Sequence, residues 1–144
     1  MRALWYDAPV RIEYAVLADH AEIVNGKLYL MGGGWDTYNA TQAPVQVRMA
    51  IAIGVRIEWE ETNKPVPVRV HIEDDDGQEI IRAEGALNVG RPPHLPPGSG
   101  QLAQMAVTLP AEIPRFGGYR IRIVAGEAEP VNELALPFRV NQRQ

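Results

Sequence analysis

The sequence has no cysteine, a single serine and only three histidines among its 144 residues. The absence of cysteine excludes disulfides and all thiol chemistry. The lone serine, Ser99, lies in Pro-Gly-Ser-Gly and not in the Gly-x-Ser-x-Gly turn that exposes a catalytic serine. Few side chains suited to catalysis are therefore present, and the sequence predicts no catalytic residue.

The sequence also lacks an excess of positive charge and a long apolar run. Its 14 Lys and Arg residues face 18 Asp and Glu, which gives a formal net charge of -4. Binding to nucleic acid phosphates needs a positive surface, so no nucleic-acid partner is expected. No stretch approaches the roughly 20 apolar residues that span a bilayer. The first ten residues lack the apolar core of a secretory signal. We therefore expect a cytoplasmic protein with no membrane partner.

Glycine and proline, by contrast, are frequent, with 13 and 12 residues. Both break helices, so a mostly helical fold is excluded. From Met49 to Trp59 every odd position is large and apolar, which is the alternation of a strand with one face in the core. Further strands are expected at residues 12–18, 27–31, 66–73, 81–89, 103–109, 119–123 and 134–140. The pattern predicts an all-β fold, an antiparallel two-sheet β-sandwich of Ig-like type with roughly eight strands. It would form a single domain over residues 11–144, after an N-terminal arm of residues 1–10.

Turn and edge signals add detail to this plan. Asn25-Gly26 is the strongest short hairpin signal in the chain, because both residues tolerate positive φ. Pro67 and Pro137 have no N–H to donate, so their strands are expected to be edges or to pair on only one side there. Two long connections, residues 32–46 and 90–101, are expected at the ends of the sandwich, where loops commonly carry binding.

The strand at residues 49–59 has small residues on the face away from the core. These are Ala50, Ala52 and Gly54, and they permit close approach by a neighbouring element or by a partner chain. The aromatic residues Trp5 and Tyr6 of the N-terminal arm also need a surface on which to pack. Together these residues form the candidate oligomer interface, and the sequence predicts a homo-oligomer, with a dimer favoured.

The two long connections carry the candidate contact residues for a ligand or a partner. Trp35 and Asp36 could stack on a sugar or metabolite ring and accept a hydrogen bond from it. Arg91, His94 and Leu95 lie in a Pro-rich segment whose stiffness would suit a protein partner. The structural alternatives are that Trp35 covers the core beside bare glycine backbone and that the Pro-rich segment is only a stiff loop.

The acidic turn Asp74-Asp75-Asp76-Gly77 is a candidate calcium site. With Gly77 at position 6 of an EF-hand loop, Ile72 and Ala83 would occupy positions 1 and 12, and neither has a side-chain oxygen. The favoured interpretation is a solvated hairpin turn, and a cation held jointly with other loops is the alternative.

Two other groups of polar residues are interpreted as surface features. The histidines lack the spacing of a metal motif, and the glutamates are expected at a solvated strand end and not across a hydrolytic cleft. These residues are His20, His71 and His94, and Glu58, Glu60 and Glu61. The sequence therefore predicts no metal and no cofactor.

Three motifs resemble those of a known family. GKLYLMGGGWDT at residues 26–37, ETN at 61–63 and GRPPHLPPG at 90–98 are similar to an uncharacterised bacterial family of short, soluble, all-β domains of unknown function. The resemblance extends from about Tyr14 to Val140, so the first ten residues lie outside it. It implies an Ig-like sandwich and no activity, because the family offers no established catalytic residues to carry over.

Three functions from different classes follow from these observations. The first is a non-enzymatic module that acts by self-assembly or contact with a protein partner. The second is the binding of a small carbohydrate or metabolite through Trp35 and the Pro-rich loop. The third is an enzyme whose site is assembled from distant loops, which would require perturbed titratable groups to converge in one cleft.

Overall fold

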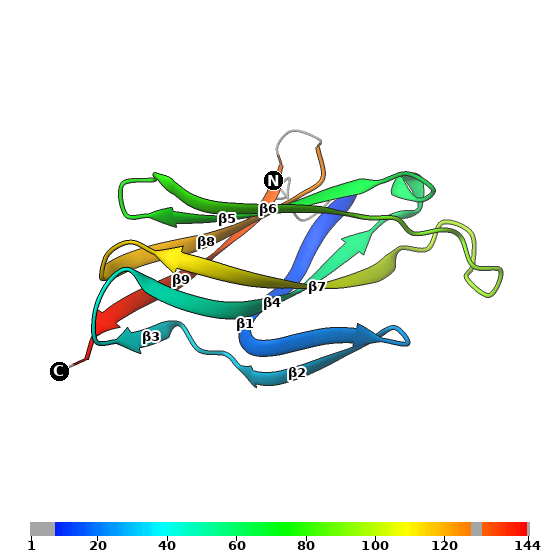
Figure 1. Cartoon of the computed structure of the whole chain (residues 1–144). Helices are drawn as coiled ribbons and strands as arrows, with labels where there is room; N and C mark the ends of the chain where they lie inside the picture. Colours follow the sequence, from blue (N-terminus) through cyan, green and yellow to red (C-terminus); the bar gives the residue numbers. More distant parts are fainter. Residues whose placement is uncertain (1–7, 128–130, 144) are drawn as a thin grey trace.

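The structure is a computed structural model that describes residues 8–127 and 131–143. In these residues nine strands form two stacked sheets (Figure 1). The four-stranded sheet contains, in spatial order, β2 (Lys27–Gly33), β1 (Val10–Val24), β4 (Val45–Ile57) and β7 (Gln101–Ile113). The five-stranded sheet contains, in spatial order, β3 (Thr37–Ala40), β9 (Asn132–Gln142), β8 (Gly117–Ala125), β5 (Val66–Asp74) and β6 (Glu79–Leu87). The predicted all-β sandwich is confirmed.

The alternating side chains of β4 form the centre of the core. Met49, Ile51, Ile53, Val55 and Ile57 are completely buried and pack against the inner side chains of the other sheet. The five-stranded sheet contributes to the core in the same way, because alternate side chains of each of its strands face inward. A 3-10 turn, Trp59–Glu61, follows β4. No helix in residues 8–127 and 131–143 is long and apolar enough to cross a membrane.

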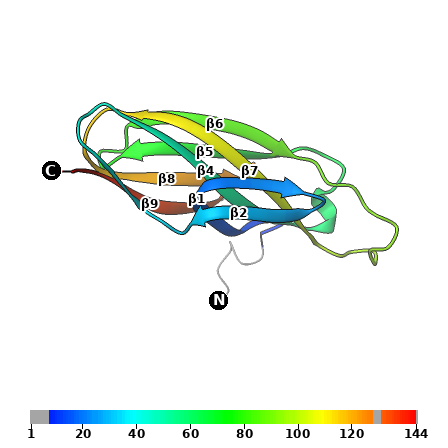
Figure 2. The ribbon, with the colours of Figure 1, turned by 60° about the horizontal axis from the view of Figure 1, so that its bottom comes forward.

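The small outer face of β4 is covered by an element of the same chain. β1 pairs with β4 up to Ala18, then bends away and continues as a hairpin with β2. This hairpin lies over the outer face of the four-stranded sheet (Figure 2). Ala50 and Ala52 have no exposed surface, and Gly54 is buried. They therefore offer nothing to a second copy, and the close approach of a neighbouring element is what the small residues permit.

The two strand prolines lie in interior strands, so the prediction of edge strands is wrong. The alternative, pairing on only one side, holds for both residues. Pro67 pairs with Ala86 of β6 and lies just beyond the end of the β5–β8 pairing. Pro137 faces Arg120 of β8 and precedes the point at which β3 begins to pair with β9. Each missing N–H therefore falls where one neighbour is absent.

The strand β3 lies within residues 32–46, which the sequence predicts to be a connection without a strand. It has four residues and pairs with β9 in parallel, so the sheet is not purely antiparallel. A strand this short shows too little alternation to be recognised. The aromatic pair Trp5 and Tyr6 lies outside the described residues, so its predicted role stays a prediction.

The packing of Tyr14 on Gly54 yields the first prediction. A Cβ added to Gly54 would overlap the Tyr14 ring. We expect Gly54→Ala to lower the free energy of unfolding by about 1–3 kcal/mol, because overpacking forces a shift of the ring or the strand. Urea unfolding followed by tryptophan fluorescence measures this change.

Gly90→Ala is the matched control, because the nearest atom to an added Cβ there is Asn63 Oδ1 at 3.7 Å. The double substitution Tyr14→Ala with Gly54→Ala should lose less stability than the sum of the two single changes. Equal losses for the Gly54 and Gly90 variants would contradict the close packing of the hairpin on β4.

Candidate functional site

The β1–β2 hairpin is turned by the predicted dipeptide. Asn25 and Gly26 have φ values of 51° and 75°, which is the conformation of a two-residue type I′ turn. The strands on either side pair in register from Val24–Lys27 to Ala18–Gly33. The turn signal in the sequence therefore fixes which residues of β1 and β2 face each other.

The underside of the hairpin is held firmly on the four-stranded sheet. Ala21 is buried with Ala50 and Ala52, and Leu28 packs against the same cluster. At the tip, the Gln104 side chain of β7 donates from Nε2 to the Gly26 carbonyl at 2.9 Å. The Tyr14 hydroxyl also bonds Gln104, and burial raises the pKa of the Tyr14 phenol. The hairpin is thus attached both by packing and at its tip.

The hairpin exposes large apolar side chains. Six large apolar side chains of the described residues are exposed, and four belong to this hairpin: Val24, Tyr29, Leu30 and Met31. Met31 is 69% exposed and Tyr29 52%. β2 also ends the four-stranded sheet, so its outer side has no neighbouring strand in the part of the chain that the structure describes. We define Val24, Tyr29, Leu30, Met31 and this open edge as the hairpin surface.

Sequence reasoning did not single out the hairpin surface. The signal was present, because residues 28–31 read Leu-Tyr-Leu-Met without the apolar and polar alternation of the other strands. A strand that is apolar on both faces is normally covered on both. Only the sheet order shows that this strand lies at an edge.

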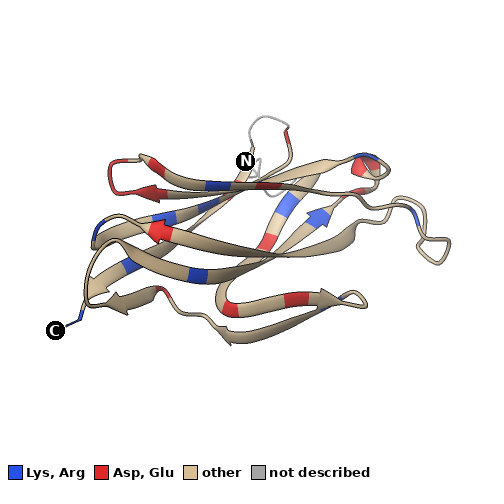
Figure 3. Cartoon of the chain, viewed as in Figure 1, with Lys and Arg blue, Asp and Glu red and all other residues tan. Residues whose placement is uncertain are grey.

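The outer face of the five-stranded sheet carries a network of charged side chains. Figure 3 marks where charged residues lie along the strands. Glu73 accepts hydrogen bonds from Arg120 Nε at 2.9 Å and from Arg122 Nη2 at 3.1 Å. These bonds, with that of Arg122 first, hold the pKa of Glu73 below its ordinary value of 4.5. Arg122 also reaches Glu133 at 3.2 Å. Glu73, Arg120, Arg122 and Glu133 are therefore used in pairing with one another.

The acidic turn is a capped hairpin turn. The buried carboxylate of Asp74 accepts the backbone N–H groups of Gln78 and Asp76 at 2.9 and 3.0 Å, and Arg115 at 3.1 Å. These bonds, led by that from Gln78, lower the pKa of Asp74. Within residues 8–127 and 131–143, no group of three or more His, Asp or Glu is placed to hold a metal ion. This geometry agrees with the favoured interpretation of the turn.

Trp35 packs inward, as a lid over the core. Its ring lies 6.2 Å from that of Phe138, and it contacts the main core cluster. Its indole N–H is buried without a hydrogen-bond partner. The neighbouring Asp36 is exposed, and its carbonyl accepts the Arg139 N–H at 2.8 Å. The Trp35 ring is therefore half-buried against the protein's own core.

Arg91 closes the base of the Pro-rich loop. Its guanidinium lies 4.0 Å from the centre of the Trp59 ring, and its Nε donates to Thr62 Oγ1 at 2.7 Å. His94 is exposed and Leu95 is half-buried further along the loop. The loop projects from the opposite end of the sandwich to the β2–β3 connection that contains Trp35 (Figures 1 and 2). The structure does not bring the two sets of candidate contact residues together.

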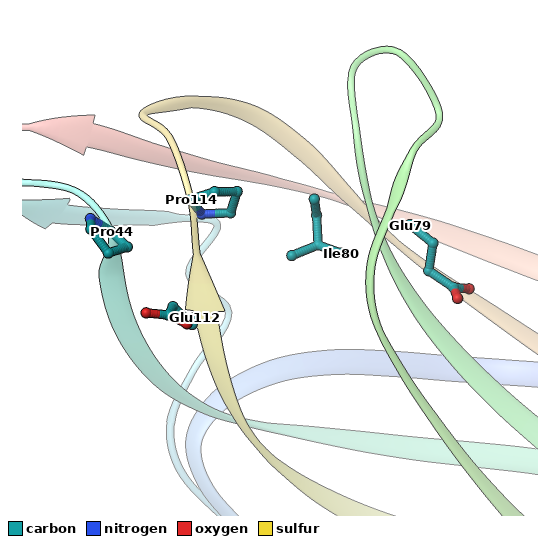
Figure 4. Close-up of a pocket in the computed structure, with 5 residues that line it drawn as sticks. All are labelled: Pro44, Glu79, Ile80, Glu112 and Pro114. Carbon is teal, nitrogen blue, oxygen red and sulfur yellow. The ribbon is translucent and has the colours of Figure 1, made fainter.

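An open groove of about 500 Å³ lies between the edges of the two sheets (Figure 4). Its walls are Pro44, Glu79, Ile80, Glu112 and Pro114. Glu79 also pairs with His71 Nδ1 at 2.5 Å, and Figure 4 shows its carboxylate turned away from the other wall residues. None of the residues predicted to contact a ligand forms these walls. The groups with displaced pKa values lie elsewhere, on β1 and on the outer face of the five-stranded sheet.

Comparison with known proteins gives a family and a fold. Residues 13–141 match the model of a family of unknown function, DUF6941. No curated protein matches. The C-terminal domain of Wzt is a similar solved structure, with a TM-score of 0.55, 12% identity, and coverage of 94% of this chain and 75% of that one. The CARDB domain of a Pyrococcus furiosus protein, solved with two metal ions, has a TM-score of 0.41, 15% identity, and coverage of 75% of this chain and 86% of that one. At 12% identity the likeness to the Wzt domain shows only the fold, an Ig-like sandwich.

The lowered pKa values of Glu73 and Asp74 predict an acid-sensitive fold. The unfolded chain binds more protons than the folded chain below about pH 4.5, so the free energy of unfolding should fall as the pH falls through this range. Glu73→Gln should cost about 1–3 kcal/mol at pH 7, because bonds to two guanidinium groups are weakened. It should also flatten the acid slope of stability, measured by urea unfolding from pH 7 to pH 3.

Glu84→Gln serves as the control, because the Glu84 side chain is 60% exposed and pairs only with Arg82. Its acid slope should match that of the unsubstituted chain. An unchanged slope in the Glu73 variant would show that the Glu73 ion pairs contribute nothing to acid sensitivity.

Proposed function

The chain belongs to the DUF6941 family of unknown function, and on that premise we propose that it is a non-enzymatic β-sandwich module that acts through protein–protein contact. The contact is made by the hairpin surface. The observation that carries this proposal is that one hairpin holds four of the six large apolar side chains that are exposed among the described residues. Exposed apolar side chains that gather on one element of a monomer favour an interaction site there.

The hairpin surface has the rigidity that a contact site needs. Its underside is packed on Ala50 and Ala52, and its tip is bonded to Gln104. A surface that is already ordered loses little conformational entropy when a partner binds. The backbone that carries the apolar side chains is therefore held in a fixed position.

The chemistry of the surface favours a protein partner. Tyr29 and Met31 are adaptable contact residues, since the first combines an apolar ring with a hydroxyl and the second is flexible and polarisable. The open strand edge adds backbone donors and acceptors, which a strand of another protein can pair with. A small ligand would need a concave site, and the hairpin surface belongs to a protruding edge.

A non-enzymatic role is supported by the distribution of the polar groups. The displaced pKa values are explained by burial and by ion pairs, with Arg56 acting on Glu13 and with Arg122 and Arg120 acting on Glu73. In the described part of the chain these groups do not converge in the groove at Glu79 and Glu112. The cytoplasmic location expected from the sequence stays a prediction.

Photo-cross-linking tests the proposal. A benzophenone amino acid in place of Met31 should cross-link to protein in cells of the source organism, giving discrete larger species on a gel. The same group in place of Leu134, which is 36% exposed on β9, is the control. We expect at least several-fold more cross-linked protein from position 31.

The mass of the cross-linked species identifies the class of partner. A species of twice the chain mass of 15.9 kDa indicates a second copy, and another mass indicates a different protein. Either outcome supports a contact module. Equal, low cross-linking from positions 31 and 134 would overturn the proposed function.

A further inference from the structure

We infer that β2 pairs with β2 of a second copy of this chain in an antiparallel arrangement, with Tyr29 facing its own counterpart at the two-fold axis. This inference rests on the proposed function and names the partner that the hairpin surface fits. Its basis is that the outward backbone groups and the side chains of one β2 strand match those of a second, antiparallel β2 strand.

The pairing with β1 shows which backbone groups of β2 face outward. The two-residue turn makes Val24 and Lys27 a hydrogen-bonded pair, and such pairs alternate with non-hydrogen-bonded ones along a hairpin. Tyr29 and Met31 therefore direct their N–H and C=O groups toward β1. Leu28 and Leu30 direct theirs to the open side. The edge thus presents two donors and two acceptors with the spacing of a strand.

The regular part of the edge runs from Lys27 to Met31. Gly32 has a φ of +61°, which interrupts the extended conformation. One antiparallel register pairs all five regular residues of the two copies, and it places Tyr29 opposite Tyr29. Leu28 and Leu30 then exchange four backbone hydrogen bonds across the axis. The open groups of the edge are all satisfied in this register.

The side chains that this register brings together are compatible on both faces. Tyr29 meets Tyr29 on the exposed face, and aromatic cross-strand pairs are favourable. Leu28 meets Leu30 on the opposite face, where Leu28 is half-buried and Leu30 is 38% exposed. Lys27 meets Met31, along which its aliphatic stem can lie while the ammonium group stays in water. No like charges face each other.

β2 differs from the other edge strands in lacking the features that block edge pairing. Charged side chains, proline and short length are the usual means of preventing sheets from joining. β7 contains Pro110 and Glu112, β6 contains Arg82 and Glu84, and β3 has four residues. β2 carries no charge and no proline after Lys27, and Figure 3 shows its body in tan. Among the described edges, β2 is the one left open to pairing.

The absence of cysteine makes the register directly testable. Residues opposite each other in a non-hydrogen-bonded pair have Cα atoms about 4.5 Å apart, within the range of a disulfide. Tyr29→Cys should therefore form a dimer through a disulfide under mild oxidation at about 50 μM protein. Met31→Cys is the matched control on the same strand, because its counterpart lies four residues away along the paired strands. We expect at least tenfold faster cross-linking at position 29.

Light scattering across a dilution series tests the pairing without a cross-link. A five-residue pairing is a small interface, so we expect a dissociation constant on the order of micromolar and a mass that doubles from 15.9 kDa as concentration rises. Tyr29→Lys places two like charges at the axis and should keep the chain monomeric. Leu134→Lys, at a site 36% exposed on another surface, should leave the dimer intact.

The outcomes separate this inference from the proposed function. A dimer that Tyr29→Lys breaks and Leu134→Lys spares supports the pairing. A chain that remains monomeric at several hundred micromolar, or a dimer indifferent to Tyr29→Lys, overturns it. Cross-linking at position 31 to a different protein would then still support a contact module. Equal cross-linking rates at positions 29 and 31 would overturn the register.

Discussion

The arrangement of this molecule depends on three small residues on the outer face of its central strand, β4. Ala50, Ala52 and Gly54 leave a shallow strip on the outside of β4, and the Tyr14 ring and the β1–β2 hairpin lie in it. Because the hairpin is held over this strip, β2 is displaced to the end of the sheet and its outer side is left open. A sheet with larger residues on this face would have no place for the hairpin. The same small residues that complete the fold therefore determine where its exposed apolar surface lies.

The two sheets present contrasting surfaces. On the five-stranded sheet, Arg120 and Arg122 are bound to Glu73, and the capped turn at Asp74 extends the ordered polar layer. Those groups are already satisfied, so a partner would gain little by displacing them. The hairpin on the four-stranded sheet exposes tyrosine, leucine and methionine instead. Contact is therefore favoured on the side of the molecule where burial of apolar surface is not opposed by the loss of ion pairs.

Much of the fold could be predicted from the sequence, because its signals are local. The alternation in β4 and the Asn25-Gly26 turn each involve residues close in the chain, and both predictions are confirmed. The candidate site depends on relations between distant residues, and these could not be inferred. Small residues at Ala50 and Ala52 indicate close approach but not what approaches. The sequence places Trp35 and Arg91 in two long loops, but it does not show that these loops lie at opposite ends of the sandwich.

The parallel pairing of β3 with β9 has a consequence for how the chain acquires its structure as it is made. Residues 37–40 pair with residues 139–142, which lie about a hundred positions later. Ribosomes add about 5–20 residues per second, so β3 waits on the order of 5–20 seconds for its partner strand to be translated. The β1–β2 hairpin is complete long before, since hairpins of this length form within about 1–10 μs. The residues of the β1–β2 hairpin are therefore available seconds before the five-stranded sheet can close.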